Sequence, residues 1–588
     1  MLFARPPVID FVDPPSEPGS GASPWQVLKT RRRDVVTLSI GPWIAHETIW
    51  RHPATRQLSG SAELRRLVAP GCTYGYDVVV EVGCRLFLEV QSVQQIIRLL
   101  QQSNIRMSVS TVADLGRRFI VLLALAHRRC SQRLRQAMSL QGGYILHLDA
   151  TYEDKSPMLM TGFDAVMEIV LGNIKLPSEK AEGIVPFLRH IQECFGPPLA
   201  LVHDMSKGIL AAIAEVFPGV PDFICHFHFL RDLGKDLLEL EYDRLRQRLQ
   251  THGTVGRVRA RLRTWRQQIQ ADPPLQQALE QLPACGWSSQ PLKQAPLLGA
   301  YLLAHWVLAG LQQGRGYGFP FDRPLLELAR RAQEAQAQIE SLLAEEPPGA
   351  WQRNRPFLRL ARELRRLLQD YPLKQTLKRL EAHSRLFDQL RQALRMAPVD
   401  GDRGLNHEGE AVEMKTLQQQ VKAFAAQIRA RPDYPTTPAL QKMIGQIDHY
   451  GPKLFADPLV VSTPQGSRTI QPQRTNNVME RLFRDVKRDC RHKTGCHSLG
   501  RTLRSMLPDT PLVKNLQNPA YLKILLDGQP TLEALFAQIE PAAVREELVK
   551  STKTPEHVPR ALRRFIAKLP NPTPIRNFVK NASSNRLS

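Results

Sequence analysis

The stretch TNNVMERLFRDVKRDCR, residues 475–491, has the pattern of an amphipathic helix. At about 100° per residue, its apolar side chains fall on one side, where they can pack into a core. The opposite side carries the carboxylate of Glu480 at the head of a row of cations: Arg484, Lys487, Arg488 and Arg491. The helix is expected to begin at capping residue types, which are Thr475, Asn476 and Asn477. Taken alone, the pattern fits a solvated face with an ion pair between Glu480 and Arg484.

The composition favours a polyanionic partner. The chain has 588 residues, enough for about two to four domains, and its 79 Lys and Arg against 56 Asp and Glu give a net charge of +23. Nucleic acid is the first candidate for such an excess. No run of about 18 apolar residues and no signal peptide is seen, so no membrane partner is expected and the protein is expected to be cytoplasmic or nucleoid-associated. The eight cysteines lack the spacing of a disulfide framework.

The N-terminal part divides into an arm and a helical region. Residues 1–34 are rich in Pro, Gly and Ser near their start and are predicted to be a disordered arm. Residues 35–140 contain apolar periodicity typical of helices at 76–87, at 93–100 and from Ser108 onward. The short turn before the Ser-capped last helix is typical of a helix-turn-helix-like DNA-binding region. Its cations are Arg117, Arg118, Arg128 and Arg129.

At Gly142 the period changes to that of strands. Residues 141–232 predict a β-β-β-α-β-α-β order, which is an α/β sheet pattern. The expected strands are 144–149, 159–163, 167–171, 199–204 and 222–227, and the expected helices are 181–195 and 207–217. The first and fourth strands end in the acids Asp149 and Asp204.

The rest of the chain is predicted to be helical. Residues 233–473 are expected to form an all-α insertion without a repeat of constant period. Residues 474–499 contain the helix that carries Glu480, and residues 500–588 are expected to be a helical, basic C-terminal tail.

Asp149 and Asp204 are candidates for a joint site, because ligands bind at the carboxyl ends of strands in open sheets. If the two strands are neighbours, the two carboxylates lie side by side and repel each other unless they are protonated or bridged by a cation. Glu480 would be a third acid. Three carboxylates suit Mg²⁺ or Mn²⁺, and two such ions about 3.5–4 Å apart can clamp a phosphodiester. The cationic row after Glu480, which includes Arg481, would then follow DNA phosphates. Either aspartate by itself also fits an ordinary loop or cap residue.

Four motifs occur together in a specific order. They are Leu146-His147-Leu148-Asp149, then Val202-His203-Asp204 followed by Lys207-Gly208, then Cys225-His226-Phe227-His228, then residues 475–488. In this order they resemble the DDE transposases of the Mutator type and their bacterial insertion-sequence relatives. The resemblance covers residues 144–232 and 474–495, and the N-terminal helices only in general plan.

The resemblance implies an α/β RNase H-like catalytic core interrupted by a large all-α insertion. The first strand would carry the first Asp, the fourth strand the second Asp, and a late helix the Glu. Asp149, Asp204 and Glu480 would be the catalytic, metal-binding acids, with two Mg²⁺ or Mn²⁺ ions per site. Cys225 and His228 match the family's Cys-x-x-His motif, whose role is structural or related to DNA.

The function implied is that of a bacterial DNA transposase. It would cleave DNA at the terminal inverted repeats of a mobile element and transfer the freed 3′-OH into target DNA, as a homodimer or larger assembly. A catalytically inactive, sequence-specific DNA-binding protein is the alternative; Ala150, where the family commonly has Gly, is the observation in its favour. A different metal-dependent nuclease on the same core is a third hypothesis.

Overall fold

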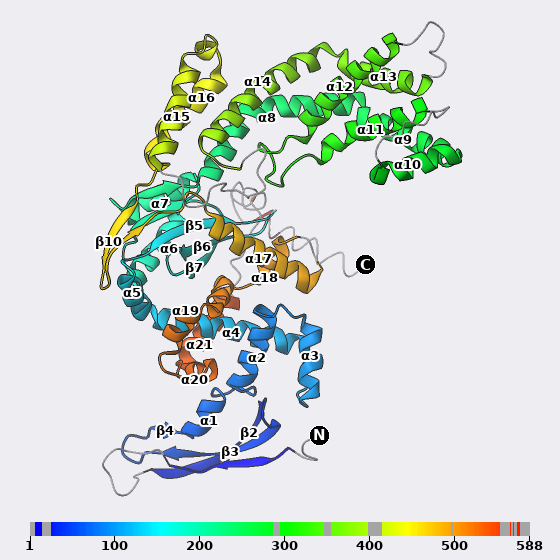
Figure 1. Cartoon of the computed structure of the whole chain (residues 1–588). Helices are drawn as coiled ribbons and strands as arrows, with labels where there is room; N and C mark the ends of the chain where they lie inside the picture. Colours follow the sequence, from blue (N-terminus) through cyan, green and yellow to red (C-terminus); the bar gives the residue numbers. More distant parts are fainter. Residues whose placement is uncertain are drawn as a thin grey trace.

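The computed structural model describes residues 6–14, 25–153, 155–285, 295–345, 354–397, 414–495 and 498–552, together with residues 565, 569, 573, 574 and 576. Figure 1 shows a small N-terminal sheet, a group of helices, a central sheet and a long helical arm that leaves the central sheet on one side. The protein is therefore mixed α/β with large helical regions.

The central sheet has five strands in the order β7-β6-β5-β8-β9. The strands are β5 (Ile145–Thr151), β6 (Met158–Asp164), β7 (Ile169–Leu176), β8 (Ala200–His203) and β9 (Asp222–Ile224). β5, β6 and β7 are antiparallel neighbours, whereas β5 pairs parallel with β8 and β8 pairs parallel with β9. The predicted strand and helix order is confirmed, with α6 (Ala181–Phe195) and α7 (Lys207–Val216) as the two helices.

The last of these strands is shorter than the apolar run 222–227 predicts. β9 ends at Ile224, and Cys225 is already the cap of the long helix α8 (His226–His252). A continuous apolar run has no period that separates a buried strand from a buried helix, so the change of structure inside it is not visible in the sequence.

The N-terminal arm contains strands, and the prediction of disorder over 1–34 is wrong for part of it. The sheet consists of β1 (Val8–Phe11), β2 (Gln26–Thr37), β3 (Gly41–Arg51) and β4 (Leu58–Ser59), with α1 (Ala62–Leu67) following. Residues 26–32 of β2 are exposed along their length, so they show no alternation of apolar and polar side chains. Their structure comes from pairing with β3, which composition does not reveal. Residues 1–5 and 15–24 of the arm lie outside the described residues.

The N-terminal helices share one core with the central sheet and the C-terminal region. The predicted helices are present as α2 (Tyr76–Phe87), α3 (Val93–Gln102) and α4 (Val109–Arg129), followed by α5 (Ser131–Leu140). α4 packs against the C-terminal elements η5 (Thr510–Gln517), α20 (Leu532–Phe536) and α21 (Pro541–Thr552), and α5 packs against α19 (Pro519–Leu526). Residues up to 552 are thus part of the core and not a tail. Nearly all of 553–588 lies outside the described residues.

The insertion has a second core of its own. It is helical as predicted, but it begins inside α8 and ends in a β-hairpin that the prediction of an all-α insertion over 233–473 missed. Its elements after α8 are α9 (Thr254–Gln270), α10 (Pro273–Cys285), α11 (Ala295–Ala309), η1 (Gly310–Gln312), α12 (Pro324–Glu345), α13 (Arg355–Leu368), α14 (Tyr371–Ala393), α15 (Met414–Arg429), η3 (Tyr434–Thr436), α16 (Pro438–Tyr450), η4 (Gly451–Lys453), β10 (Leu459–Thr463) and β11 (Gly466–Ile470). The chain then returns to the sheet with α17 (Asn477–Thr494) and α18 (Gly500–Ser505).

One stretch of the insertion meets the length and hydropathy of a membrane span. Residues Ala295–Gln312 have a mean hydropathy of 1.3, which the sequence analysis overlooked because the stretch is broken by polar residues. About 39% of it is buried within the protein. Core helices of the same composition meet the same criterion.

The packing of α2 on α4 gives a test of the N-terminal core. A Cβ at Gly83 of α2 would lie 2.1 Å from Cγ of the buried Phe119 ring of α4. We expect Gly83→Ala to lower the free energy of unfolding by about 1–3 kcal/mol, because the core must be pushed apart. Gly256→Ala is the matched control, since its Cβ meets nothing within 4 Å on α9 and should leave stability unchanged or raise it by up to about 1 kcal/mol. Equal urea-denaturation midpoints for the two variants would contradict this packing.

Candidate active site

The two candidate aspartates lie at the same level of neighbouring strands. β5 and β8 run parallel, and His147 pairs with Val202. Asp149 and Asp204 each lie two residues beyond that pair, so both are at the carboxyl edge of the sheet. The side chain of Asp204 also accepts a hydrogen bond from the backbone N–H of Ser206 at 3.1 Å, at the entry to α7. The strand adjacency on which a joint site depends is therefore present.

Asp149 is the most deeply placed of the three acids. Its carboxylate accepts the N–H of Ala150 at 2.8 Å, and only 7% of the residue is exposed. Burial raises its pKa from the usual 3.8 to about 8, with repulsion from Asp204 as the next cause and from Glu480 as a smaller one. The N–H of Ala150 and the charge of Arg231 oppose this shift. The carboxyl thus keeps its proton at neutral pH unless a cation is present to balance the negative charge.

Glu480 reaches the same site from the other end of the sequence. It lies in the first turn of α17, where the positive end of the helix dipole favours a carboxylate. It is half-buried, and burial raises its pKa, whereas Arg231 and Arg484 lower it. Because Glu480 repels Asp149 and both interact with Arg231, the three acids form one electrostatically coupled group.

Asn476 holds α17 in this position. It is fully buried; its side-chain amide donates to the carbonyl of Leu148 at 2.8 Å, and its oxygen lies 2.7 Å from Nδ1 of His147. Burial lowers the pKa of His147 to about 4, so this imidazole is neutral and Nδ1 is the donor. Asn476 occupies the cap position, but its side chain bonds to β5 and not to its own helix, which corrects the expectation of simple capping. The residue before Asp149 is thereby tied to the start of the Glu480 helix.

Cys225 ties the same point to α8. Its thiol accepts the backbone N–H of Asn476 at 3.3 Å, and its own N–H donates to the carbonyl of His203 at the end of β8. Burial raises the pKa of Cys225 to about 12, so the group stays a neutral thiol. His228, the other residue of the Cys-x-x-His motif, is buried on α8 with a pKa lowered to about 3 by burial and by Arg231 and Lys235. These contacts give Cys225 a positioning role.

The sequence analysis missed three charged neighbours of the site. Arg231 lies one helical turn beyond His228 and lowers the pKa of both Asp149 and Glu480. Glu179 and Asp232 lie near Asp204. Burial raises the pKa of both carboxyls, and the negative charge of Asp204 raises it by a smaller amount. Arg231 could have been found from its helical spacing to the Cys-x-x-His motif, but Glu179 lies in a loop without any pattern.

The donor chemistry fits a hard divalent cation. Carboxylate oxygens are the preferred ligands of Mg²⁺ and Mn²⁺, and a cation would relieve the repulsion that raises the pKa of Asp149. Within the described ranges, no three His, Cys, Asp or Glu side chains lie close enough together to form a ready-made metal cluster. The three acids are therefore grouped by their strands and helix, and their side chains are not drawn into a metal-binding arrangement.

The cations of α17 lie on the surface as predicted. Arg481, Arg484, Lys487, Arg488 and Arg491 are all exposed. Arg488 pairs with Asp485 at 3.0 Å, and the other four have no ion pair among the described residues. The row next to Glu480 is thus available to an anionic partner.

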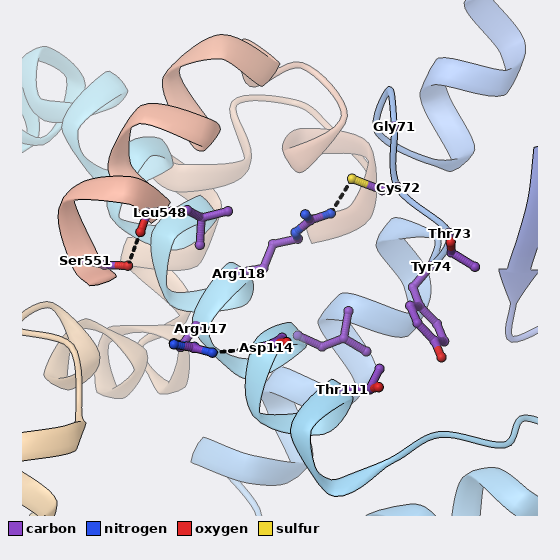
Figure 2. Close-up of a pocket in the computed structure, with 11 residues that line it drawn as sticks. Gly71, Cys72, Thr73, Tyr74, Thr111, Asp114, Arg117, Arg118, Leu548 and Ser551 are labelled. Carbon is purple, nitrogen blue, oxygen red and sulfur yellow. Dashed lines mark hydrogen bonds and ion pairs between the residues drawn. The ribbon is translucent and has the colours of Figure 1, made fainter. Parts of the chain in front are cut away.

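The arginines of the N-terminal helices are not available in the same way. Figure 2 shows Arg118 directed at Cys72 and Arg117 turned toward Asp114, beside a cavity of about 430 Å³ between α4, α21 and the loop 71–74. Nη1 of Arg118 is 2.5 Å from the Cys72 sulfur. Arg128 pairs with Asp509 and Glu547, and Arg129 donates to the carbonyl of Gln538. The DNA contacts predicted for this helix therefore compete with internal partners, and none of the three acids lines this cavity.

Comparison of the sequence with models of known protein families gives no match, and neither does comparison with curated proteins.

The bonds of Asn476 lead to a stability test. We expect Asn476→Ala to lower the free energy of unfolding by about 2–4 kcal/mol, because it leaves buried groups of His147 and Leu148 without partners. Asn477→Ala is the matched control, because the neighbouring Asn477 is only partly buried and its side chain has no hydrogen bond to β5 among the described residues; its effect should stay below about 1 kcal/mol. Urea denaturation followed by circular dichroism measures both.

The raised pKa of Asp149 leads to a pH test. Its folded-state pKa of about 8 lies above the usual 3.8, so its contribution to stability is complete below about pH 4 and is lost as the pH rises through 8. In EDTA, the stability of the wild type should fall relative to Asp149→Asn by up to about 1.4 kcal/mol per pH unit across this window. Parallel pH profiles of the two proteins would rule out the buried, proton-binding state of Asp149.

Proposed function

We propose that this protein is a DNA transposase of the DDE type, which cleaves DNA at element ends and joins the freed 3′-OH to target DNA. The observation that carries the proposal is the convergence of Asp149, Asp204 and Glu480. Two adjacent parallel strands present the aspartates at one level, and Asn476 anchors the helix that brings the glutamate.

The chain order around the site supports an RNase H-like core. The first strand of the central sheet, β5, carries the first acid, and the fourth, β8, leads directly into the second. The third acid comes late, on α17, after an insertion that starts within α8. This is the arrangement that the resemblance to Mutator-type transposases implies.

The three carboxylates would hold Mg²⁺ or Mn²⁺. When bound, such ions lower the pKa of water and stabilise the attacking and leaving oxygens of a phosphodiester. The chain's own part is to place the acids: the parallel register positions Asp149 and Asp204, and Asn476 and Cys225 hold the start of α17. Arg231 provides a positive charge near Asp149 and Glu480 in the absence of other cations.

The exposed cations of α17 would bind the DNA backbone beside the acids. Arg481, Arg484, Lys487 and Arg491 follow Glu480 along the helix and are free of ion pairs within the described chain. Each cation that contacts a phosphate adds sequence-independent affinity that weakens with salt. Recognition of terminal inverted repeats and assembly of two or more protomers belong to the same proposal, because two DNA ends must be joined.

A cleavage assay tests the proposal. The substrate is duplex DNA that carries the repeats flanking the gene, with Mg²⁺ or Mn²⁺ and readouts for strand cleavage and strand joining. We expect Glu480→Gln to retain DNA binding and to lose at least about 100-fold in cleavage rate, because one metal-binding charge is removed. Glu182→Gln is the control, since Glu182 is an exposed acid on α6 and its loss should leave the rate unchanged.

The outcomes separate the candidate functions. If the wild type cleaves the substrate and Glu480→Gln, Asp149→Asn and Asp204→Asn cleave it equally well, the assignment of the three acids is wrong. Specific binding of the repeats without cleavage by any protein favours the catalytically inactive DNA-binding protein.

A further inference from the structure

Three neighbouring helices of the insertion carry an unusual concentration of arginine. α9, α11 and α13 pack against one another and together contain ten arginines, no lysine and a single acid, Glu363. α9 has five of these arginines and no acid, and α11 has no charged residue apart from His305, if that is protonated. This small unit therefore holds a large share of the chain's net charge of +23.

Internal ion pairs use only part of this charge. Glu363 is buried and lies within 3.3 Å of side-chain nitrogens of Arg257, Arg261 and Arg366. Arg365 pairs with Glu340 of α12. The remaining six arginines are exposed and have no ion pair in the part of the chain that the structure describes; they are Arg259, Arg263, Arg266, Arg355, Arg359 and Arg362.

Three of the six form a row on α9. Arg259, Arg263 and Arg266 have the offsets 0, 4 and 7, which place them on one face over about 10 Å. Arg259 and Arg263 line a groove of about 780 Å³ between α9 and the α11–η1 segment, together with His305, Leu308 and Leu311. Two arginines of the row thus line one concave surface, and Arg266 continues the row on the same face of α9. Figure 1 shows these helices at the end of the insertion away from the central sheet.

We propose that the groove between α9 and α11 is a second DNA-binding surface, which binds the phosphate backbone through Arg259, Arg263 and Arg266. Double-stranded DNA presents a phosphate about every 1.7 Å along its axis, so about 10 Å of helix faces several of them. No acid of α9 or α11 opposes this partner. The proposal rests on the proposed function only in taking DNA as the polyanion.

An anionic lipid surface is the rival partner, because α11 meets the composition of a membrane span. Peripheral binding to a membrane needs an exposed apolar face next to the cations. On α11 only Ala295 and His305 are exposed, and its large apolar side chains are buried or half-buried among neighbouring helices. The apolar side chains that line the groove, among them Leu308 and Leu311, are only partly exposed and lie within a hollow, where they cannot insert into a bilayer, which favours nucleic acid.

The test compares the full-length wild type with Arg259→Gln/Arg263→Gln/Arg266→Gln. Binding to a labelled duplex of about 30 base pairs is measured in EDTA by fluorescence anisotropy, at salt concentrations from about 50 to about 200 mM. The loss of three phosphate contacts should reduce the slope of log affinity against log salt by about 2 to 3 and weaken binding at least about tenfold. The single variant Arg263→Gln should reduce the slope by about 1, and it replaces the triple variant if the latter does not fold.

The matched control is Lys374→Gln/Lys378→Gln/Lys422→Gln. It removes the same number of exposed positive charges that have no ion pair in the described part of the chain, from other surfaces of the insertion, on α14 and α15. Its affinity should stay within about twofold of the wild type, because distant charges contribute little through screened solvent.

Equal losses in the control and the α9 variant, or no loss in the α9 variant, overturn the groove as a DNA-binding surface. The proposal is also overturned if the α9 variant loses binding to vesicles of anionic phospholipid while its DNA binding is unchanged. The binding assay does not depend on catalysis. If the protein never cleaves DNA but needs the α9 arginines to bind it, the proposed transposase function is contradicted and the groove remains a DNA-binding surface. A wild type that binds no duplex contradicts both.

Discussion

The buried side chain of Asn476 is the contact on which the candidate site depends. It joins the backbone of β5 at Leu148 and the imidazole of His147 to the start of a helix 328 residues further along the chain. Apolar contacts alone would let the helix slide or rotate on the sheet, because they have little directional preference. Buried hydrogen bonds of an amide specify distance and orientation, and leaving their partners unsatisfied is costly. Glu480, one turn later, therefore arrives at a defined place relative to Asp149.

α8 connects this point to the insertion. Its cap residue, Cys225, bonds to both Asn476 and the end of β8. Its next turns place Arg231 near the acids, and its far end is built into the core of the arm. One continuous helix thus runs from the acids to the helical arm.

The distribution of charge is as informative as its total. Arg128 and Arg129 of α4 bond to groups of the C-terminal region, and the arginines around Glu363 stabilise the packing of α9 on α13. Apart from Arg488, which pairs with Asp485, the exposed arginines and Lys487 of α17 and the exposed arginines of the α9–α11 groove have no ion pair within the described residues. Arg484, Arg488 and Arg491 of α17 have the same helical spacing as Arg259, Arg263 and Arg266 of α9, on a separate part of the protein. An anion that spans the two would contact the core and the arm together.

Local pattern was sufficient for much of the fold. Strands of the central sheet, α6, α7, the N-terminal helices and the amphipathic nature of α17 follow from periodicities of two and of 3.6 residues. Asp149 and Asp204 could be singled out because each closes a short apolar run, although β5 continues to Thr151 and β8 already ends at His203. β2 and the end of β9 could not be, since an exposed paired strand and a strand-to-helix change inside an apolar run leave no periodic signal.

What the sequence determined was therefore most of the helices, the strands of the central sheet, and the acids and cations that these elements carry. The tertiary structure decided which of them meet: that β5 lies beside β8, that Asn476 bonds to β5 instead of capping its helix, and that Arg231 faces the acids. It also decided that Arg128 of α4 is paired, whereas Arg259, Arg263 and Arg266 of α9 are exposed and have no ion pair among the described residues. The physical reason is that long-range hydrogen bonds and ion pairs depend on distances between segments hundreds of residues apart, which no local periodicity encodes.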